Sequence, residues 1–451
     1  MYTFSNRLRI ASFILMAVGV VGIAIGFMSA PSTVEEAKAI VAKHDAGHGE
    51  AHAAPASEHH QATDTHMESN EHQVAANHEA GHDAGHDAHL LQQFQNKPWA
   101  AVYVAALFFL FIALGVLAFY GINRAAQAGW SPLLFRVMEG ITAYLVPGGI
   151  IVFVLLAMSV AHMNHLFVWL DPEVVAHDKL IQGKSGYLNG AGLLIRAAIF
   201  IGGWVAYRTL SRKWSLAQDK ASDNANFVKN FRLSAGFLVF FLISESMMSW
   251  DWVMSVDPHW FSTLFGWYVF ATMFVSAVTV LALITIYLKS KGYLQQVNNS
   301  HIHDLAKFMF AFSIFWTYLW FSQFMLIWYS NIPEEVTYFV TRIQDFKLSY
   351  FLMIAINFVL PVLLLINSDF KRINWLVIMT GLIILFGHYL DVYHMIVPAT
   401  VGDQASIGLT EISALLFFAG LFIFVVFTEL TKAPLTPENN PLIEESKHFH
   451  Y

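Results

Sequence analysis

Residues 99–121 read W-A-A-V-Y-V-A-A-L-F-F-L-F-I-A-L-G-V-L-A-F-Y-G and contain no charged side chain. A helix needs about 20 mostly apolar residues to cross the hydrocarbon core of a bilayer. The whole chain is 56% hydrophobic and only 13% charged, which is more apolar than soluble proteins are. The stretch therefore predicts a transmembrane helix, and the composition predicts that it is one of several.

Similar apolar runs recur along the chain and bring the number of predicted spans to ten. They are 8–28, 99–121, 139–161, 187–209, 233–252, 263–288, 304–329, 348–367, 374–397 and 409–430. Only helices or closed barrels satisfy the backbone inside a bilayer, and these runs are too long and too uniform for barrel strands. We predict an all-α polytopic membrane protein with about ten transmembrane helices.

The loops between these spans carry the charge that orients them. Most Lys and Arg residues fall in the loops on the side of the two termini, which the positive-inside rule places in the cytoplasm. Arg7 and Arg9 before the first span resemble the start of a signal peptide, but the apolar run is long and Pro31 would follow the cleavage site. We expect a retained helix over 1–30, a multi-pass protein of the bacterial cytoplasmic membrane, and no nucleic-acid partner.

Residues 31–97 interrupt the membrane pattern with a segment rich in His, Ala, Asp and Glu. Its composition cannot build a core, so we predict a solvated, low-complexity outer loop. The alternative is metal binding, since histidines four residues apart share a face if the segment is helical. The histidines with this spacing are His44, His48, His52, His78, His82 and His86.

The chain has no cysteine, which bounds the redox chemistry that it could perform alone. Disulfides, thiolate-bound iron–sulfur clusters and covalently attached haem c all require cysteine. The spans also lack a pair of histidines suited to ligate one haem from two helices. We therefore predict no cofactor bound by this chain and no catalytic residue of its own.

A few ionisable side chains lie within otherwise apolar spans. Each costs roughly 2.5–3.5 kcal/mol at the centre of a bilayer, so each is a functional candidate by default. They could form a proton path, or serve a quinol site as bases, or be buried ion pairs such as Arg196 with Glu245. Glu139 is the candidate for proton uptake from the cytoplasm, although it could instead pair with Arg136. The candidates are Glu139, Arg196, Glu245, His388, Asp391 and His394.

The ninth span contains the densest group of these residues, in G-H-Y-L-D-V-Y-H-M-I-V-P at 387–398. His388 and His394 each lie three residues from Asp391, so all three share one side of the helix. Ionisable groups this close can titrate as a coupled set. Nothing in the spacing requires a metal.

Three segments resemble one known family. They are D-W-V-M-S-V-D-P-H-W-F-S-T at 251–263, F-S-Q-F-M-L-I-W-Y-S-N-I-P-E-E at 321–335 and L-D-V-Y-H-M-I-V-P at 390–398. Together they make the chain similar to the NrfD-like (polysulfide reductase-like) integral subunits of bacterial alternative complex III. The His-rich segment after the first span and the length make it look like the ActF type.

The resemblance implies a fold and an assembly. It implies two four-helix bundles, over 98–252 and 253–400, with two additional helices over 1–30 and 401–430 and a cytoplasmic tail over 431–451. It also implies that the chain belongs, with lipids around it, to a quinol:cytochrome c (electron acceptor) oxidoreductase of the respiratory chain. The haem c and iron–sulfur clusters of that complex would lie on partner subunits. The partners implied are a multihaem cytochrome c, an iron–sulfur protein and a homologous NrfD-like subunit. Menaquinone or another quinone is the expected substrate of the complex.

We expect this chain to scaffold the complex and to conduct protons. Two alternatives stay open at the level of sequence. The chain could itself bind and oxidise the quinol, with Asp391 or His394 as the base. It could also be a free-standing secondary transporter of an ion or small anion, a class in which broken helices meet at mid-membrane.

Overall fold

The computed structural model describes residues 1–47 and 71–450, with side chains described outside 43–86, and within these residues the chain is helical with no strand. Ten helical stretches are long and apolar enough to cross a membrane, which confirms the predicted class. The helices that form them are α1 (Asn6–Met28), α3 (Glu71–Ala125), α4 (Phe135–Ile141) with α5 (Leu145–Val160), α8 (Gly190–Gln218), α9 (Ala225–Met248), α10 (Phe265–Ser290), α11 (Asn299–Ser330), α13 (Lys347–Ile354) with α14 (Leu360–Leu365), α15 (Asn374–Thr400) and α16 (Leu409–Leu430).

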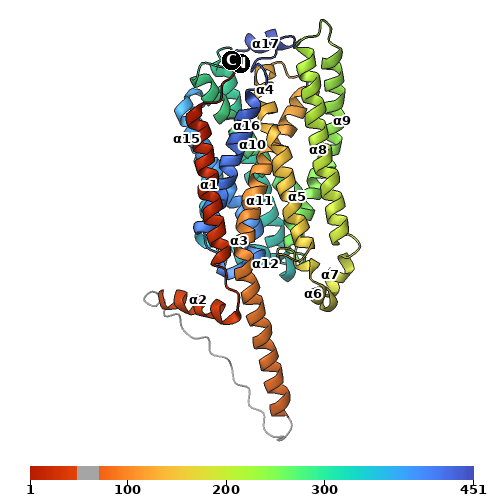
Figure 1. Ribbon diagram of the computed structural model, residues 1–451, viewed down its shortest axis with the longest axis vertical. Helices are drawn as coiled ribbons and strands as arrows, with labels where there is room; N and C mark the ends of the chain where they lie inside the picture. The colour runs from red at the N-terminus through yellow and green to blue at the C-terminus, as the bar shows by residue number, and fades with distance from the viewer. Residues whose placement is uncertain (48–70, 451) are drawn as a thin grey trace.

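The spans stand side by side, and the short helices lie at the two ends (Figure 1). Both termini lie at one end, with α17 (Ile443–Lys447), and we call it the terminus end. At the opposite end, called the loop end, lie α2 (Val34–Gly47), α6 (Pro172–His177), α7 (Lys179–Lys184) and α12 (Pro333–Gln344). The tail after α16 packs back on the chain, where Ser446 donates a hydrogen bond to the carbonyl of Trp130.

The helix contacts divide the membrane part into two groups of four spans and one pair. In the first bundle α3, α5, α8 and α9 pack in sequence around a common core. In the second bundle α10 packs against α11 and α15, α15 packs against α13 and α14, and α11 packs against α14. Contacts between α3 and α10 join the two bundles, and α1 packs along α16 beside them.

Glycines allow α1 and α16 to approach at backbone distance. A Cβ atom on Gly19 would lie 2.6 Å from the backbone nitrogen of Phe417, and one on Gly420 would lie 2.6 Å from the carbonyl oxygen of Ser12. Lipid gives helices no hydrophobic reason to associate, so close packing at small residues has to hold such a pair together.

Gly19→Val is therefore expected to destabilise the chain by about 1–3 kcal/mol, because the new side chain meets backbone that cannot rotate away. The midpoint of thermal unfolding in detergent measures this. Gly202→Val is the matched control, since a Cβ atom on Gly202 meets nothing within 4 Å. Equal midpoints for the two variants would contradict the role given to Gly19.

The His-rich segment, predicted to be a loop, is helical at both of its ends. Residues 34–47 form α2, and α3 begins at Glu71 and runs without a break into the second span. Extending an existing helix needs no new nucleus, and the segment is rich in alanine, so helix is favoured there. The side chains of His44, His78, His82 and His86, and the whole of His48 and His52, lie outside the described residues.

Two spans contain a π-helical turn, where one extra residue enters the helix. The first, Ser249–Val253, carries the fifth span past its predicted end at residue 252, so that the span ends at Val256. The second, Ala355–Val359, separates α13 from α14 and holds the buried Asn357. Such turns are rare in helices and frequent at functional sites.

Candidate functional site

Asp391 lies on α15 at the centre of the second bundle, and its side chain is fully buried. Three neutral donors converge on its carboxyl group. Thr272 of α10 donates to Oδ2 at 2.6 Å and Trp316 of α11 donates to the same oxygen at 2.8 Å, while the Tyr268 hydroxyl donates to Oδ1. These donors stabilise the carboxylate without adding a compensating charge.

The carboxyl group of Asp391 has no cationic partner in the described part of the chain. Among the described residues, no Lys or Arg lies within ion-pair distance of Asp391, and the nearest ionisable nitrogen is Nδ1 of His388 at 3.6 Å. An unpaired carboxylate is costly inside a membrane, and the three donors offset only part of that cost. A carboxyl group without a described cation at this position in a span is a functional candidate by default.

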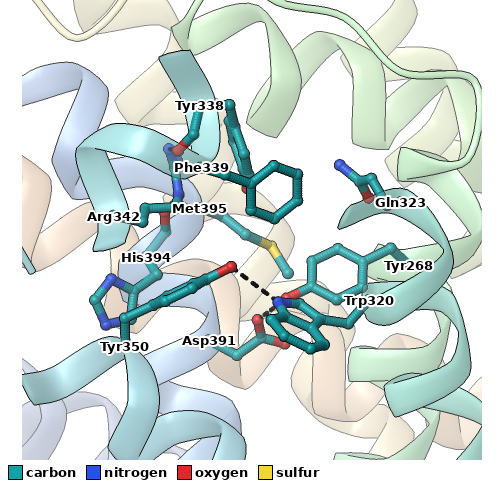
Figure 2. Close-up of a pocket in the computed structure, with 10 residues that line it drawn as sticks. All are labelled: Tyr268, Trp320, Gln323, Tyr338, Phe339, Arg342, Tyr350, Asp391, His394 and Met395. Carbon is teal, nitrogen blue, oxygen red and sulfur yellow. Dashed lines mark hydrogen bonds between the residues drawn. The ribbon is translucent and has the colours of Figure 1, made fainter. Parts of the chain in front are cut away.

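A cavity of about 10 Å³ lies beside Asp391 (Figure 2). That volume holds roughly one water molecule, which is far less than a quinone head group occupies. Figure 2 shows Trp320 donating a hydrogen bond of 2.9 Å to the Tyr350 hydroxyl at the edge of the cavity. The lining residues are Tyr268, Trp320, Gln323, Tyr338, Phe339, Arg342, Tyr350, Asp391, His394 and Met395.

The amphipathic helix α12 covers this cavity at the loop end. Its Arg342 is buried, stacks on Tyr338 with 3.4 Å between the guanidinium carbon and the ring centroid, and donates a hydrogen bond of 3.0 Å to the carbonyl of His394. Among the described residues, no carboxylate forms an ion pair with Arg342. A buried cation thus lines the same small cavity as a buried acid.

The two histidines of the ninth span have different surroundings. His388 is fully buried with its ring edge-to-face on Trp316, and within the described residues neither of its ring nitrogens has a hydrogen-bond partner. His394 packs edge-to-face against Phe346, Tyr350 and Tyr393, and lines the cavity with Asp391. The predicted grouping of these residues on one side of α15 is therefore also a grouping in space.

Buried polar side chains continue from Asp391 toward the terminus end of the second bundle. Asn357 lies against Gly387, next to His388, and neither of its side-chain polar atoms has a partner among the described residues. Thr279, Ser313 and Thr380 are likewise buried with unpartnered hydroxyls. Buried polar groups in proteins are normally satisfied, so these four residues form a file of unsatisfied groups on the terminus side of Asp391.

Three of the other predicted residues lie in the first bundle and form no common site with Asp391. Arg196 pairs with Asp251, at 2.6 Å from Nε to Oδ2, so the pairing suggested for it with Glu245 was wrong. The π-helical turn after α9 presents Asp251 to Arg196, while the side-chain hydrogen bonds described for Glu245 come from the hydroxyls of Ser246 and Ser249 in its own span.

Glu139 lies in a buried ionic cluster at the terminus end of the first bundle. It accepts a hydrogen bond of 2.7 Å from Arg136, which is the alternative left open for it, and Arg124 and Arg212 each lie 3.7 Å away. Asp219 closes the cluster by pairing with Arg136. Burial raises the pKa of the Asp219 carboxyl, and the Arg136 charge opposes that shift. Three arginines thus surround one carboxylate, so the pair with Arg136 that was left open for Glu139 is present.

Sequence reasoning missed the residues that come to Asp391 from other helices. Tyr268, Thr272 and Trp316 look like ordinary members of apolar spans, and Arg342 looks like part of a surface loop. The amphipathic pattern of 333–344 is the one signal that could have drawn attention to Arg342.

Two comparisons with known proteins found no match to this chain. No protein-family model matches the chain, and no curated protein matches its sequence. Among the described residues, no group of three or more His, Cys, Asp or Glu side chains is arranged to hold a metal ion.

Proposed function

We propose that this chain is a membrane subunit of a quinol:electron acceptor oxidoreductase complex, in which it scaffolds the assembly and conducts protons through its second bundle. The observation that carries the proton route is Asp391, a buried acid held by neutral donors beside a cavity for one water. The respiratory assignment rests on the three sequence segments that resemble the NrfD-like subunits.

In the proposed route, protons enter at the terminus end along the file of unpartnered polar groups. Water held by Thr279, Ser313, Thr380 and Asn357 would deliver a proton to the region of His388 and Asp391. Asp391 would bind it and pass it to the water in the cavity. The charge of Arg342 would then favour its departure toward the loop end.

The redox centres of the complex would lie on partners, because this chain has no cysteine to hold them. The proposed partners are a multihaem cytochrome c, an iron–sulfur protein and a second NrfD-like subunit, in a bacterial cytoplasmic membrane with both termini in the cytoplasm. Direct oxidation of a quinol in this chain is disfavoured, since the cavity beside Asp391 is too small for the head group as it stands.

A free-standing secondary transporter is the second candidate. The interruptions in the third and eighth spans favour it, because transporters bind their substrates at broken helices. The cavity beside Asp391 argues against a transporter, because it has room for one water molecule and not for a larger substrate.

Purification in mild detergent through a tag on this chain separates the two candidates. We expect a multihaem cytochrome c and an iron–sulfur protein to co-purify, and a reduced-minus-oxidised spectrum with c-type haem bands. A colourless chain that purifies alone would overturn the respiratory assignment and favour the transporter.

A further inference from the structure

Gln323 is a buried amide that the proposed proton route does not yet use. It lies on α11, is 3% exposed and lines the cavity beside Asp391. Within the described part of the chain, no group forms a hydrogen bond with its side-chain amide. An amide can donate twice and accept twice, and burial without any partner is costly. A partner outside the protein, namely water in the cavity, would remove this cost.

The position of Gln323 along α11 places it on the loop-end side of Asp391. It follows Trp316 by seven residues, so both side chains lie on the same side of the helix. Since α11 runs towards the loop end, Gln323 lies about 10 Å closer to that end than Trp316 does. Trp316 donates its hydrogen bond to Asp391. A proton that leaves Asp391 for the loop end therefore passes the level of Gln323.

Some of the other polar groups that line the cavity already have partners. The Tyr268 hydroxyl donates to Asp391, and the Trp320 indole donates to the Tyr350 hydroxyl. That hydroxyl can still donate its own proton. A buried water needs two to four polar partners, and the cavity holds about one water. Asp391, Tyr350 and Gln323 together supply three such partners.

The charge of Arg342 makes the two sides of the cavity unequal. Arg342 lines the cavity from the side opposite Gln323 (Figure 2). Its guanidinium is buried and is held by the carbonyl of His394. A hydronium ion is repelled by this cation, and repulsion between like charges is stronger in a protein interior than in water. The uncharged side at Gln323 is therefore the more favourable way out.

We propose that Gln323 is a positioning residue, which binds the water beside Asp391 and directs the released proton along α11 to the loop end. This inference rests on the proposed proton route. Asp391 gives its proton to the water oxygen and becomes the carboxylate, and the hydronium ion gives a proton to solvent on the side of Gln323. An amide suits this task, because it can both accept from water and donate to it without taking up the proton itself.

Gln323→Met tests the proposal, since methionine has nearly the same length and shape but no amide. Proton conduction is measured with the purified complex in vesicles, driven by a potassium diffusion potential. We expect the initial rate to fall about tenfold or more, because transfer is sensitive to small misplacements of the groups involved. Gln323→Glu keeps a hydrogen-bonding group of the same length and should recover most of the lost rate. Equally low rates in both variants would assign Gln323 a packing role and overturn the proposal.

Infrared spectroscopy separates proton binding from proton release. The carbonyl stretch of protonated Asp391, identified by its absence in Asp391→Asn, should persist in Gln323→Met. Loss of this band in Gln323→Met would overturn the proposal, because Gln323 would then act on the binding of the proton. If Gln323→Met unfolds in detergent, Gln323→Leu takes its place.

Gln344→Met is the matched control, because Gln344 lies at the end of α12 with an exposed side chain and does not line the cavity. An equal loss of conduction in this control would overturn the role of Gln323. Wild-type conduction by an intact Gln323→Met complex, where Asp391→Asn abolishes conduction, would also overturn that role and leave the proton route standing. Wild-type conduction in both variants would overturn the route itself.

Discussion

Asp391→Asn is expected to lower proton conduction by about 100-fold or more, because an amide cannot take up and release the proton that the carboxyl group would carry. The fold should survive the change. The amide has the same shape: its oxygen in the Oδ2 position can still accept from Trp316 and Thr272, and the Tyr268 hydroxyl can rotate to accept from its nitrogen.

The measurement uses vesicles that contain the purified complex and a trapped pH-sensitive dye. A potassium diffusion potential then drives protons across the membrane, and the initial rate of the pH change reports conduction. Unfolding midpoints and the set of co-purifying subunits show whether the variant is intact. Wild-type conduction by an intact Asp391→Asn complex would rule out the proposed route.

Glu245→Gln is the matched control for this experiment. It makes the same acid-to-amide change at a buried membrane position, but in the first bundle, where the hydrogen bonds described for Glu245 come from Ser246 and Ser249. Conduction should persist in this variant. Loss of conduction in Glu245→Gln, with wild-type rates in Asp391→Asn, would place the route in the first bundle instead.

Glu139→Gln is expected to destabilise the chain by about 3–5 kcal/mol, because it removes the carboxylate that compensates buried arginines. Arg136 would keep Asp219 as a partner, but Arg124 has no other described carboxylate within ion-pair distance. Its guanidinium would remain buried against the rings of Tyr120 and Phe135 without an opposite charge.

The shift of the unfolding midpoint in detergent measures this effect. Glu444→Gln is the control, since it also removes a carboxylate next to a cation, Lys447, but on an exposed part of the tail. No measurable loss is expected there, because water solvates both groups. Similar midpoints for Glu139→Gln and Glu444→Gln would show that the buried cluster does not hold this end of the bundle together.

The sequence by itself determined the class of the fold and the grouping of three site residues on one helix. Each span needs about 20 apolar residues whatever its neighbours are, so a span can be predicted from its own stretch of sequence. The predicted tenth span has the same bounds as α16, Leu409–Leu430. The grouping of His388, Asp391 and His394 also follows from one helix, because residues three apart share a face.

The helical ends of the His-rich segment were not predicted, because its composition is compatible with either state. There the neighbouring membrane helix decided the outcome, since α3 is continuous from Glu71 into the second span. The end of the fifth span was not predicted either. The extra residue of the π-helical turn, which presents Asp251 to Arg196, has no simple signature in hydropathy.

Only the tertiary structure decided which side chains meet. Asp391 receives its hydrogen bonds from α10 and α11, whose contributing residues lie far from it along the chain. Arg342 reaches the same cavity from α12, whereas Glu139, Arg196 and Glu245 stay in the first bundle. Apolar patterning specifies that a helix crosses the membrane, but the rotation of each helix and the choice of its neighbours depend on side-chain packing between helices, which no single span encodes.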